Sequence, residues 1–188
     1  MLSLKPKWYT ILPVSFILLF IITSVWALTI EKASLQELTN ESALVVIGKV
    51  ISIEYEWEDA NQNAINTNIT IEVNQYIKGS GDSQIKITQL GGHIGDFGDV
   101  IPGTPNFVMD EEVIFFLFEH NNKYWIHSIA LGCFRIFEEE NGQKSVMNDL
   151  RNIHLINPVT NQEVEPEDAI TYFPMDVFIN EIESYLGK

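Results

Sequence analysis

A glycine-rich segment in the middle of the chain carries the residue types best suited to chemistry. Residues 91–106, GGHIGDFGDVIPGTPN, hold five of the eleven glycines and two of the seven prolines. An imidazole and two carboxylates lie within seven residues, and glycines let a backbone wrap closely around an ion. Asp and Gly are equally common in turns, so the pattern also fits a long irregular loop with a structural role. The candidate contact residues for a ligand, partner or metal are Gly91, Gly92, His93, Asp96 and Asp99.

The other residues with catalytic potential lack the neighbours that catalysis needs. His120, His127 and His154 have no second histidine at metal-ligand spacing, and the chain has no HExxH motif, which excludes a zinc protease of that type. Ser80 stands between two glycines but lacks the Gly-x-Ser-x-Gly elbow of serine hydrolases. The spacing in the glycine-rich segment matches no established calcium or zinc pattern. We therefore assign no catalytic residues, no metal ligands and no cofactor.

Charge is distributed unevenly along the chain. Of its eleven basic residues, Lys5 and Lys7 precede a long apolar run, whereas all 26 acidic residues follow it. Residues 28–188 thus hold 26 acids against nine basic side chains, a net charge of −17. Such a surface repels phosphate backbones, so we expect no nucleic-acid partner. The only cysteine, Cys133, excludes an intramolecular disulfide, and its apolar neighbours predict a buried, unreactive side chain.

The N-terminal segment predicts export. No charged residue occurs from Trp8 to Leu28, and twelve of the eighteen residues 11–28 are Ile, Leu, Val or Phe. Lys5 and Lys7 on its N-terminal side place the rest of the chain outside the cytoplasm. A cleaved signal peptide ending near Ala27 and an uncleaved helical anchor in the membrane both fit this pattern. We therefore expect residues 1–28 to be a hydrophobic signal or anchor helix, and residues 29–188 to be a secreted or membrane-anchored domain.

Alternation of apolar and polar residues predicts the elements that position the glycine-rich segment. The capping box Ser34–Glu37 starts a short helix that ends near Glu41. Asn141-Gly142 is a strong hairpin signal, and residues 175–186 form an amphipathic helix. The expected strands cover residues 43–59, 67–77, 84–90, 112–118, 124–129 and 133–137. The pattern predicts a mainly β domain, a small closed or nearly closed barrel with one helix at each end.

Several stretches resemble a widespread group of exported bacterial and archaeal domains. They include SLQELTNESALVVIGKVISIEYEWE, ITIEVNQYIKG and IALGCFRI. In some proteins of that group the domain stands before a matrixin-type metalloprotease. The pattern is also similar to netrin-like and metalloprotease-inhibitor-like OB barrels, without their disulfides. The resemblance implies an OB-like barrel outside the cytoplasm, and it implies no activity.

One departure from that group affects the backbone. Where the group tends to have Phe-x-x-Gly-Glu, this chain has Phe107-Val108-Met109-Asp110-Glu111. Asp adopts a left-handed backbone more readily than most residues, so we expect Asp110 to preserve the turn.

The expected function is a non-enzymatic binding or accessory module of the cell envelope. It would contact an envelope protein or a ligand through residues 91–106, and the membrane through its N-terminal segment where that segment is not cleaved. The alternative is a metal-binding protein or metal-dependent enzyme that uses the same segment.

Overall fold

The computed structural model describes residues 29–150, 153–157, 159–165, 168 and 170–188. The predicted hydrophobic helix at residues 1–28 lies outside these residues. Among the helices that the structure describes, none combines the length and apolar character needed to cross a bilayer. Strands hold 49% of the described residues and helices 13%, which confirms the mainly β prediction.

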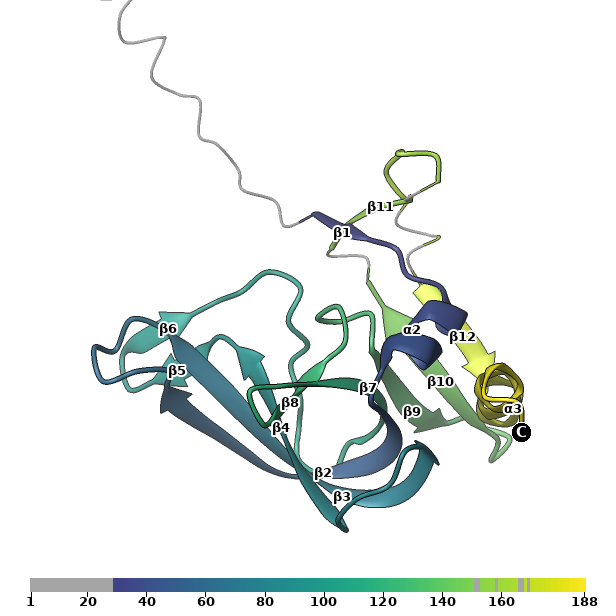
Figure 1. Cartoon of the computed structure of the whole chain (residues 1–188), viewed down its shortest axis with the longest axis horizontal. Helices are drawn as coiled ribbons and strands as arrows, with labels where there is room; N and C mark the ends of the chain where they lie inside the picture. Colours follow the sequence, from purple (N-terminus) through teal and green to yellow (C-terminus); the bar gives the residue numbers. More distant parts are fainter. Residues whose placement is uncertain (1–28, 151–152, 158, 166–167, 169) are drawn as a thin grey trace, which may run out of the picture.

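Twelve strands and two helices make up the described chain (Figure 1). The helices are α2 (Leu35–Glu41) and α3 (Met175–Tyr185). The strands are β1 (Thr29–Glu31), β2 (Leu44–Trp57), β3 (Ile65–Lys78), β4 (Gln84–Leu90), β5 (Gly92–Ile94), β6 (Phe97–Asp99), β7 (Glu112–His120), β8 (Lys123–Ile126), β9 (Cys133–Glu138), β10 (Lys144–Asp149), β11 (His154–Ile156) and β12 (Ile170–Pro174).

One large sheet dominates the fold. Its strand order is β12-β10-β9-β7-β2-β3-β4-β8, and β8 also pairs with β7. Strands β7, β2, β3, β4 and β8 are thus hydrogen-bonded in a ring, while β9, β10 and β12 continue outward from β7. The sheet is therefore not the clean barrel that the sequence suggested. Two further pairs, β1 with β11 and β5 with β6, lie outside it.

The burial of strand β2 changes along its length, following the change in its sequence pattern. Its first residues are buried on both faces and its last ones are largely exposed, as the sequence predicts for a strand that leaves a core. Gly48 lies at an irregularity in the pairing of β2 with β3. A Cβ at this position would stand 2.7 Å from Cδ1 of Ile71, so glycine permits the two strands to approach.

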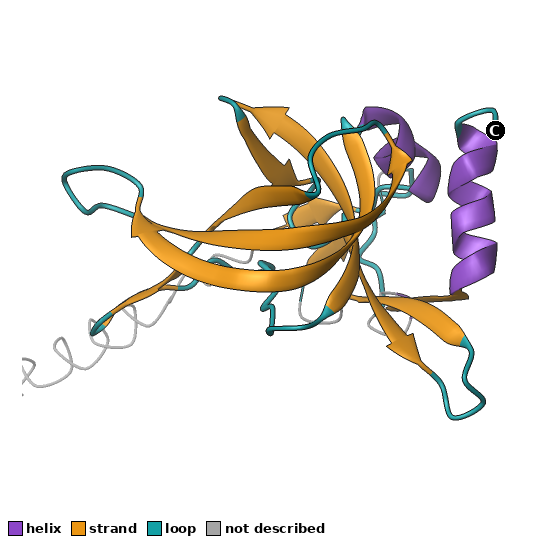
Figure 2. Ribbon diagram, turned by 90° about the horizontal axis from the view of Figure 1, so that it is seen from below, coloured by secondary structure: helices purple, strands orange, loops and turns teal. Residues whose placement is uncertain are grey.

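Two buried clusters hold the domain together. The first lies inside the ring, and its members come from all five ring strands, among them Ile69, Ile87 and Phe115. The second lies between the outer side of the sheet and the two helices, which Figure 2 shows at the same end of the molecule. Phe178 and Ile182 anchor α3 in this second cluster and are fully buried. Both helices therefore cover the outer side of the sheet with their apolar faces.

Local rules predicted both helices correctly. The hydroxyl of Ser34 accepts from the backbone amide of Glu37 at 3.2 Å, and the Glu37 carboxylate accepts from the Ser34 amide at 2.8 Å. These reciprocal bonds form the predicted capping box, and the bonds that the carboxylate accepts from the Ser34 amide and hydroxyl lower the pKa of the Glu37 carboxyl. Asp110 has a φ of 68° and pairs with Lys49, so the expected left-handed turn is present.

One expectation about a loop was wrong, and two short strands were not predicted. The glycine-rich segment is not irregular throughout, because its first half folds into the β5–β6 hairpin. In the region after Asn148, where the sequence pattern indicated no strand, the structure has β11 and β12. Strand β11 pairs in parallel with β1, which lies more than 120 residues earlier in the chain. Contacts of such range leave no trace in local sequence patterns.

Candidate functional site

The predicted contact residues lie on and around the β5–β6 hairpin, at the end of the molecule opposite α3 (Figure 1). Gly91 and Gly92 have φ angles of 90° and 141°. A Cβ on Gly91 would lie 2.8 Å from the carbonyl oxygen of Asp99, and one on Gly92 would lie 2.6 Å from Cδ1 of Tyr55. Both glycines are therefore required by the backbone and by the closeness of the neighbouring atoms.

The hairpin does not assemble its imidazole and carboxylates into one ligand set. His93 lies opposite Gly98 and Asp99 lies opposite Gly92, so the two side chains project from opposite faces of the hairpin. The His93 ring packs against Tyr55 with 4.3 Å between ring centroids, and Asp96 is exposed in the turn. Within the described residues, no three His, Cys, Asp or Glu side chains are grouped so that they could hold a metal.

A neighbouring cavity differs from the others on the described surface in that its wall is almost entirely apolar. Its volume is about 280 Å³. Strands β4, β7 and β8, the turn after β8 and the segment after β6 enclose it. The lining residues are Thr88, Gln89, Leu90, Ile101, Thr104, Pro105, Phe118, Trp125, Ile126, Ser128 and Ile129.

This apolar cavity exists because β4 and β8 separate soon after they meet. They pair in parallel at only two positions, Ile87 with Tyr124 and Thr88 with Trp125. In contrast, β8 stays paired with β7 from Lys123 to Ile126, and just past its end the amide of His127 still donates to the carbonyl of Phe116 at 2.8 Å. The two strands therefore open into a wedge that no backbone fills.

The turn after β8 forms one wall of the apolar cavity, and its backbone conformation is unusual. Ser128 and Ile129 have φ angles of 50° and 60°. A left-handed backbone is uncommon for any residue but glycine and is rare for a β-branched one, with a cost of about 1–3 kcal/mol. The buried amide of Asn148 holds this turn by donating to the carbonyls of Ala130 at 3.1 Å and Leu131 at 2.9 Å.

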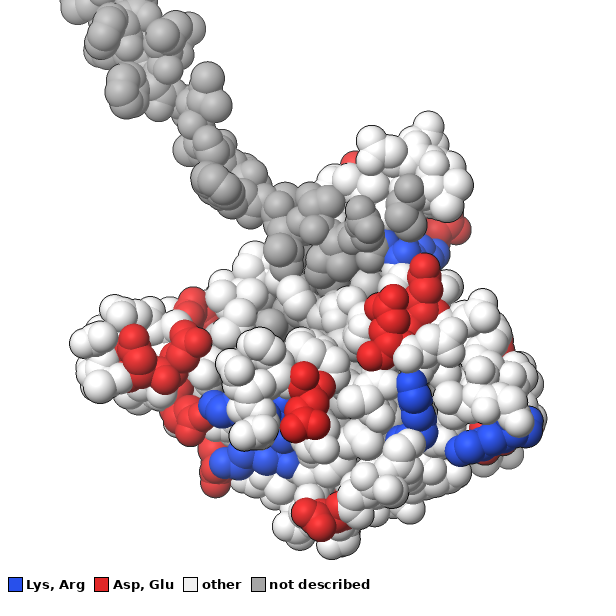
Figure 3. All heavy atoms as spheres, in the orientation of Figure 1, with Lys and Arg blue, Asp and Glu red and all other residues white. Residues whose placement is uncertain are grey.

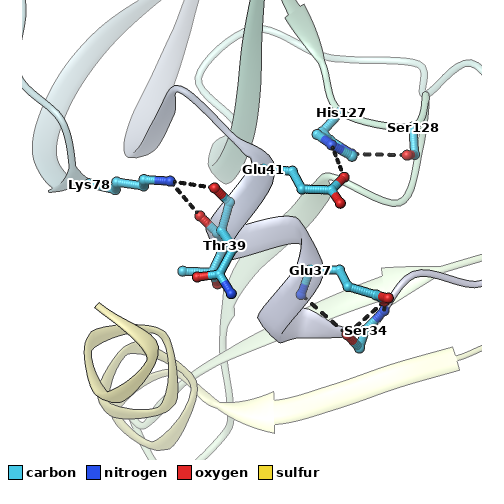
Figure 4. Close-up of polar contacts among 8 residues, drawn as sticks. Ser34, Glu37, Thr39, Glu41, Lys78, His127 and Ser128 are labelled. Carbon is cyan, nitrogen blue, oxygen red and sulfur yellow. Dashed lines mark hydrogen bonds and ion pairs between the residues drawn. The ribbon is translucent and has the colours of Figure 1, made fainter. Parts of the chain in front are cut away.

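Helix α2 supports the same turn from the other side. In Figure 4, His127 lies between Glu41 at the end of α2 and its own neighbour Ser128. Nε2 of His127 stands 3.3 Å from the Glu41 carboxylate, and its Nδ1 stands 2.9 Å from the Ser128 hydroxyl. Lys78 fixes the helix by donating to the carbonyls of Thr39 and Asn40 at 2.8 and 2.9 Å. Because the Lys78 ammonium group lies at the C-terminal end of α2, it also interacts favourably with the helix dipole.

A second cavity of about 250 Å³ brings the predicted segment next to the apolar cavity. Gly91, Gly92, His93 and Asp99 line this second cavity, whereas Asp96 does not. Four residues, Gln89, Leu90, Ile101 and Thr104, line both cavities. The side-chain amide of Gln89 donates to the carbonyl of Pro105 at 3.0 Å and so fixes the segment that separates them. The predicted residues thus border the apolar cavity without forming it.

Cys133 does not supply a reactive group. It is 5% exposed within the ring cluster, and burial raises the pKa of its thiol to about 12. Since the thiolate is the reactive form, Cys133 is inert at neutral pH, in agreement with its apolar sequence context.

No family model matches the chain, and no curated protein is significantly similar to it. The resemblance to exported domains and OB barrels therefore remains a prediction, and the function must be argued from the geometry.

The sequence patterns considered above do not point to the residues that form the apolar cavity. Phe118 and Trp125 are cross-strand partners on β7 and β8, and both line it. The signal for them was the Asn121-Asn122 pair between the two strands, whose φ angles of 53° and 58° are those of a tight hairpin. Counting outward from that turn places Phe118 opposite Trp125. No comparable signal marks the left-handed turn at Ile129.

Proposed function

We propose that this chain is a non-enzymatic binding module of the cell envelope, built on an OB-like barrel. It receives a bulky apolar group of a ligand or partner in the apolar cavity. The cavity itself supports the proposal, because it has a volume of about 280 Å³, its walls are almost entirely apolar, and a ligand group can enter it from solvent. A cavity of about 150 Å³ lined by Leu, Ile and Phe is enough to bind benzene, so this one has room for a larger ring system.

The pairing of the ring strands supports the OB-like part of the proposal. OB folds are five-stranded, partly open barrels that bind ligands with their strands and loops. The ring of β7, β2, β3, β4 and β8 has five members, and its β4–β8 closure is short. The three additional strands are then an extension attached to β7.

The uncharged run before residue 29 supports the location. A segment of that length and composition, preceded by lysines, is typical of export. A net charge of −17 on residues 28–188 suits a soluble domain exposed outside the cytoplasm. We propose that the domain works there, free or anchored.

The binding step is measurable with a small aromatic probe. N-acetyltryptophanamide carries an indole ring and no net charge. About 18 heavy atoms at about 0.3 kcal/mol each give about 5 kcal/mol, so a dissociation constant on the order of 0.1–1 mM is expected. The protein would be produced in a host that exports it and used in the form that the host yields, in nanodiscs if the N-terminal segment is retained. Binding of N-acetyltryptophanamide would be measured by saturation-transfer NMR and by titration.

A matched pair of variants locates the probe. Leu90 lines the apolar cavity and is 43% exposed, while Val177 on α3 is 47% exposed and lies outside it. Leu90→Arg places a charge at the wall and should weaken binding at least tenfold. Val177→Arg should leave binding unchanged. An absence of saturable binding to the wild type, or equal loss in both variants, would refute the proposal.

A further inference from the structure

The second cavity differs from the apolar cavity in the chemistry of its wall. Polar and apolar atoms contribute to it about equally, whereas apolar atoms form almost all of the wall of the apolar cavity. The two cavities share Gln89, Leu90, Ile101 and Thr104, so a single ligand can occupy both. The pair of cavities therefore suits a ligand with one apolar part and one polar part.

Several polar side chains on the wall of the second cavity are already engaged within the protein. The hydroxyl of Thr67 donates to the carbonyl of Gly91 at 2.6 Å, and the hydroxyl of Thr104 donates to the carbonyl of Ile101 at 2.7 Å. Gln89 uses its amide to hold the segment after β6. These side chains fix the shape of the wall, and the polar contacts to a ligand must come from others.

Three further polar side chains on this wall remain available to a ligand. Within the described part of the chain, the side chains of Tyr55, Asp99 and Asn106 form no hydrogen bond or ion pair. Asp99 lies opposite Gly92 in the β5–β6 hairpin, so the two residues face the same side of it. A Cβ at Gly92 would lie 2.6 Å from Cδ1 of Tyr55 and 2.8 Å from Oγ1 of Thr67, both on the cavity wall. The half-buried Asp99 carboxylate therefore projects toward the cavity.

The hydrogen-bonding capacity of these three side chains matches hydroxyl groups. The carboxylate of Asp99 only accepts hydrogen bonds, whereas the amide of Asn106 and the hydroxyl of Tyr55 both donate and accept. A hydroxyl group also donates and accepts, so it can pair with each of them. A cationic head would pair with Asp99 but would leave the donors of Asn106 and Tyr55 unmatched. An anionic head would be repelled by Asp99 and by the acidic side chains that Figure 3 shows at this end of the molecule.

We infer that the ligand is amphipathic, with an apolar group in the apolar cavity and an uncharged sugar ring in the second cavity. This inference rests on the proposed function and names the class of its ligand. A cavity of about 150 Å³ is enough for benzene, so the second cavity, at about 250 Å³, has room for a six-membered ring with hydroxyl groups. Removal of the apolar group from water supplies most of the affinity, and hydrogen bonds to the sugar give orientation and specificity.

A series of compounds with the same indole ring and different heads tests the inference. The series consists of indole, the β-glucoside and β-galactoside of indoxyl, indoxyl sulfate and tryptamine. Hydrogen bonds to three side chains should give the better glycoside at least a tenfold advantage in affinity over indole. The anionic sulfate and the cationic tryptamine should both bind more weakly than that glycoside. In saturation-transfer NMR, its sugar protons should receive saturation as well as its indole protons.

Matched variants show whether the sugar lies in the second cavity. Asp99→Ala should reduce the advantage of the glycoside at least threefold and leave the affinity for indole unchanged. Asn106→Ala should act in the same way from a different segment, and its backbone carbonyl can still accept from Arg135. Asp96→Ala is the control, because it removes the same charge from the exposed turn of the hairpin, which lines neither cavity. Thermal melts of the three variants confirm folding.

The outcomes separate this inference from the proposed function. If neither glycoside binds more tightly than indole, the sugar head is refuted while the apolar cavity remains a binding site. Tighter binding of tryptamine or of the sulfate would replace the sugar with a charged head. Equal losses in Asp99→Ala and Asp96→Ala would overturn the placement in the second cavity. Failure of every compound and of N-acetyltryptophanamide would overturn both proposals.

Discussion

Replacing Asn148 with alanine tests how the left-handed turn that forms one wall of the apolar cavity is held. The side chain of Asn148 is 4% exposed, and its amide donates to the carbonyls of Ala130 and Leu131. Truncation removes the donor from two buried carbonyl oxygens. If water partly replaces the amide, each loss should lower the free energy of unfolding by about 1–1.5 kcal/mol. We expect a loss of about 2–3 kcal/mol in the free energy of unfolding. For a domain of this size the melting temperature should fall by about 4–12 °C.

Thermal and urea denaturation of Asn148→Ala should be compared with those of Asn74→Ala. Asn74 is exposed on β3, and its one long contact to Glu112 measures 3.5 Å, so its truncation should cost less than about 0.5 kcal/mol. The affinity for N-acetyltryptophanamide should also fall in Asn148→Ala, because Ile129 belongs to the loosened turn. A variant that melts within about 1 °C of the wild type and binds the probe normally would show that the turn does not depend on Asn148.

Two further predictions concern the thiol and the glycine-rich segment. Burial raises the pKa of Cys133 from 9.0 to about 12, so its stabilising effect is complete below pH 9 and is lost as pH rises toward 12. The free energy of unfolding should therefore fall less steeply above pH 9 in Cys133→Ala than in the wild type; parallel curves would contradict the burial argument. Metal analysis of untagged wild type and His93→Ala should give the same content, whereas stoichiometric metal lost in the variant would restore the metal-site alternative.

Elements that depend on neighbouring residues were predictable from the sequence. The capping box at Ser34 and Glu37 defines the start of α2, and alternation in β2 identifies a strand that becomes exposed along its length. Asp110 adopts the left-handed backbone that its side chain tolerates. In each case the decisive interaction spans only a few residues, so the sequence records it directly.

Features made by distant residues could not be predicted in the same way. The apolar cavity combines residues 88–90, 101–105 and 118–129, and its size depends on where β4 and β8 separate. The contact between Glu41 and His127 joins α2 to a turn 86 residues later in the chain. The glycine-rich segment was a useful signal for a tight backbone, but its composition could not show that His93 and Asp99 project to opposite faces.

The backbone, rather than the packing of side chains, explains why the apolar cavity stays open. For β8 to remain beside β4, the chain would have to continue as a strand past Ile126, but at the left-handed residues Ser128 and Ile129 it turns back and enters β9, which pairs with β7. Both sides of the wedge are therefore fixed without an occupant. Leu90 and Phe118 remain 43% and 37% exposed at its edge, where polar side chains would suit a purely structural role. Preformed apolar walls on a rigid frame lose little entropy when they bind, which favours recognition of a partner over a structural role alone.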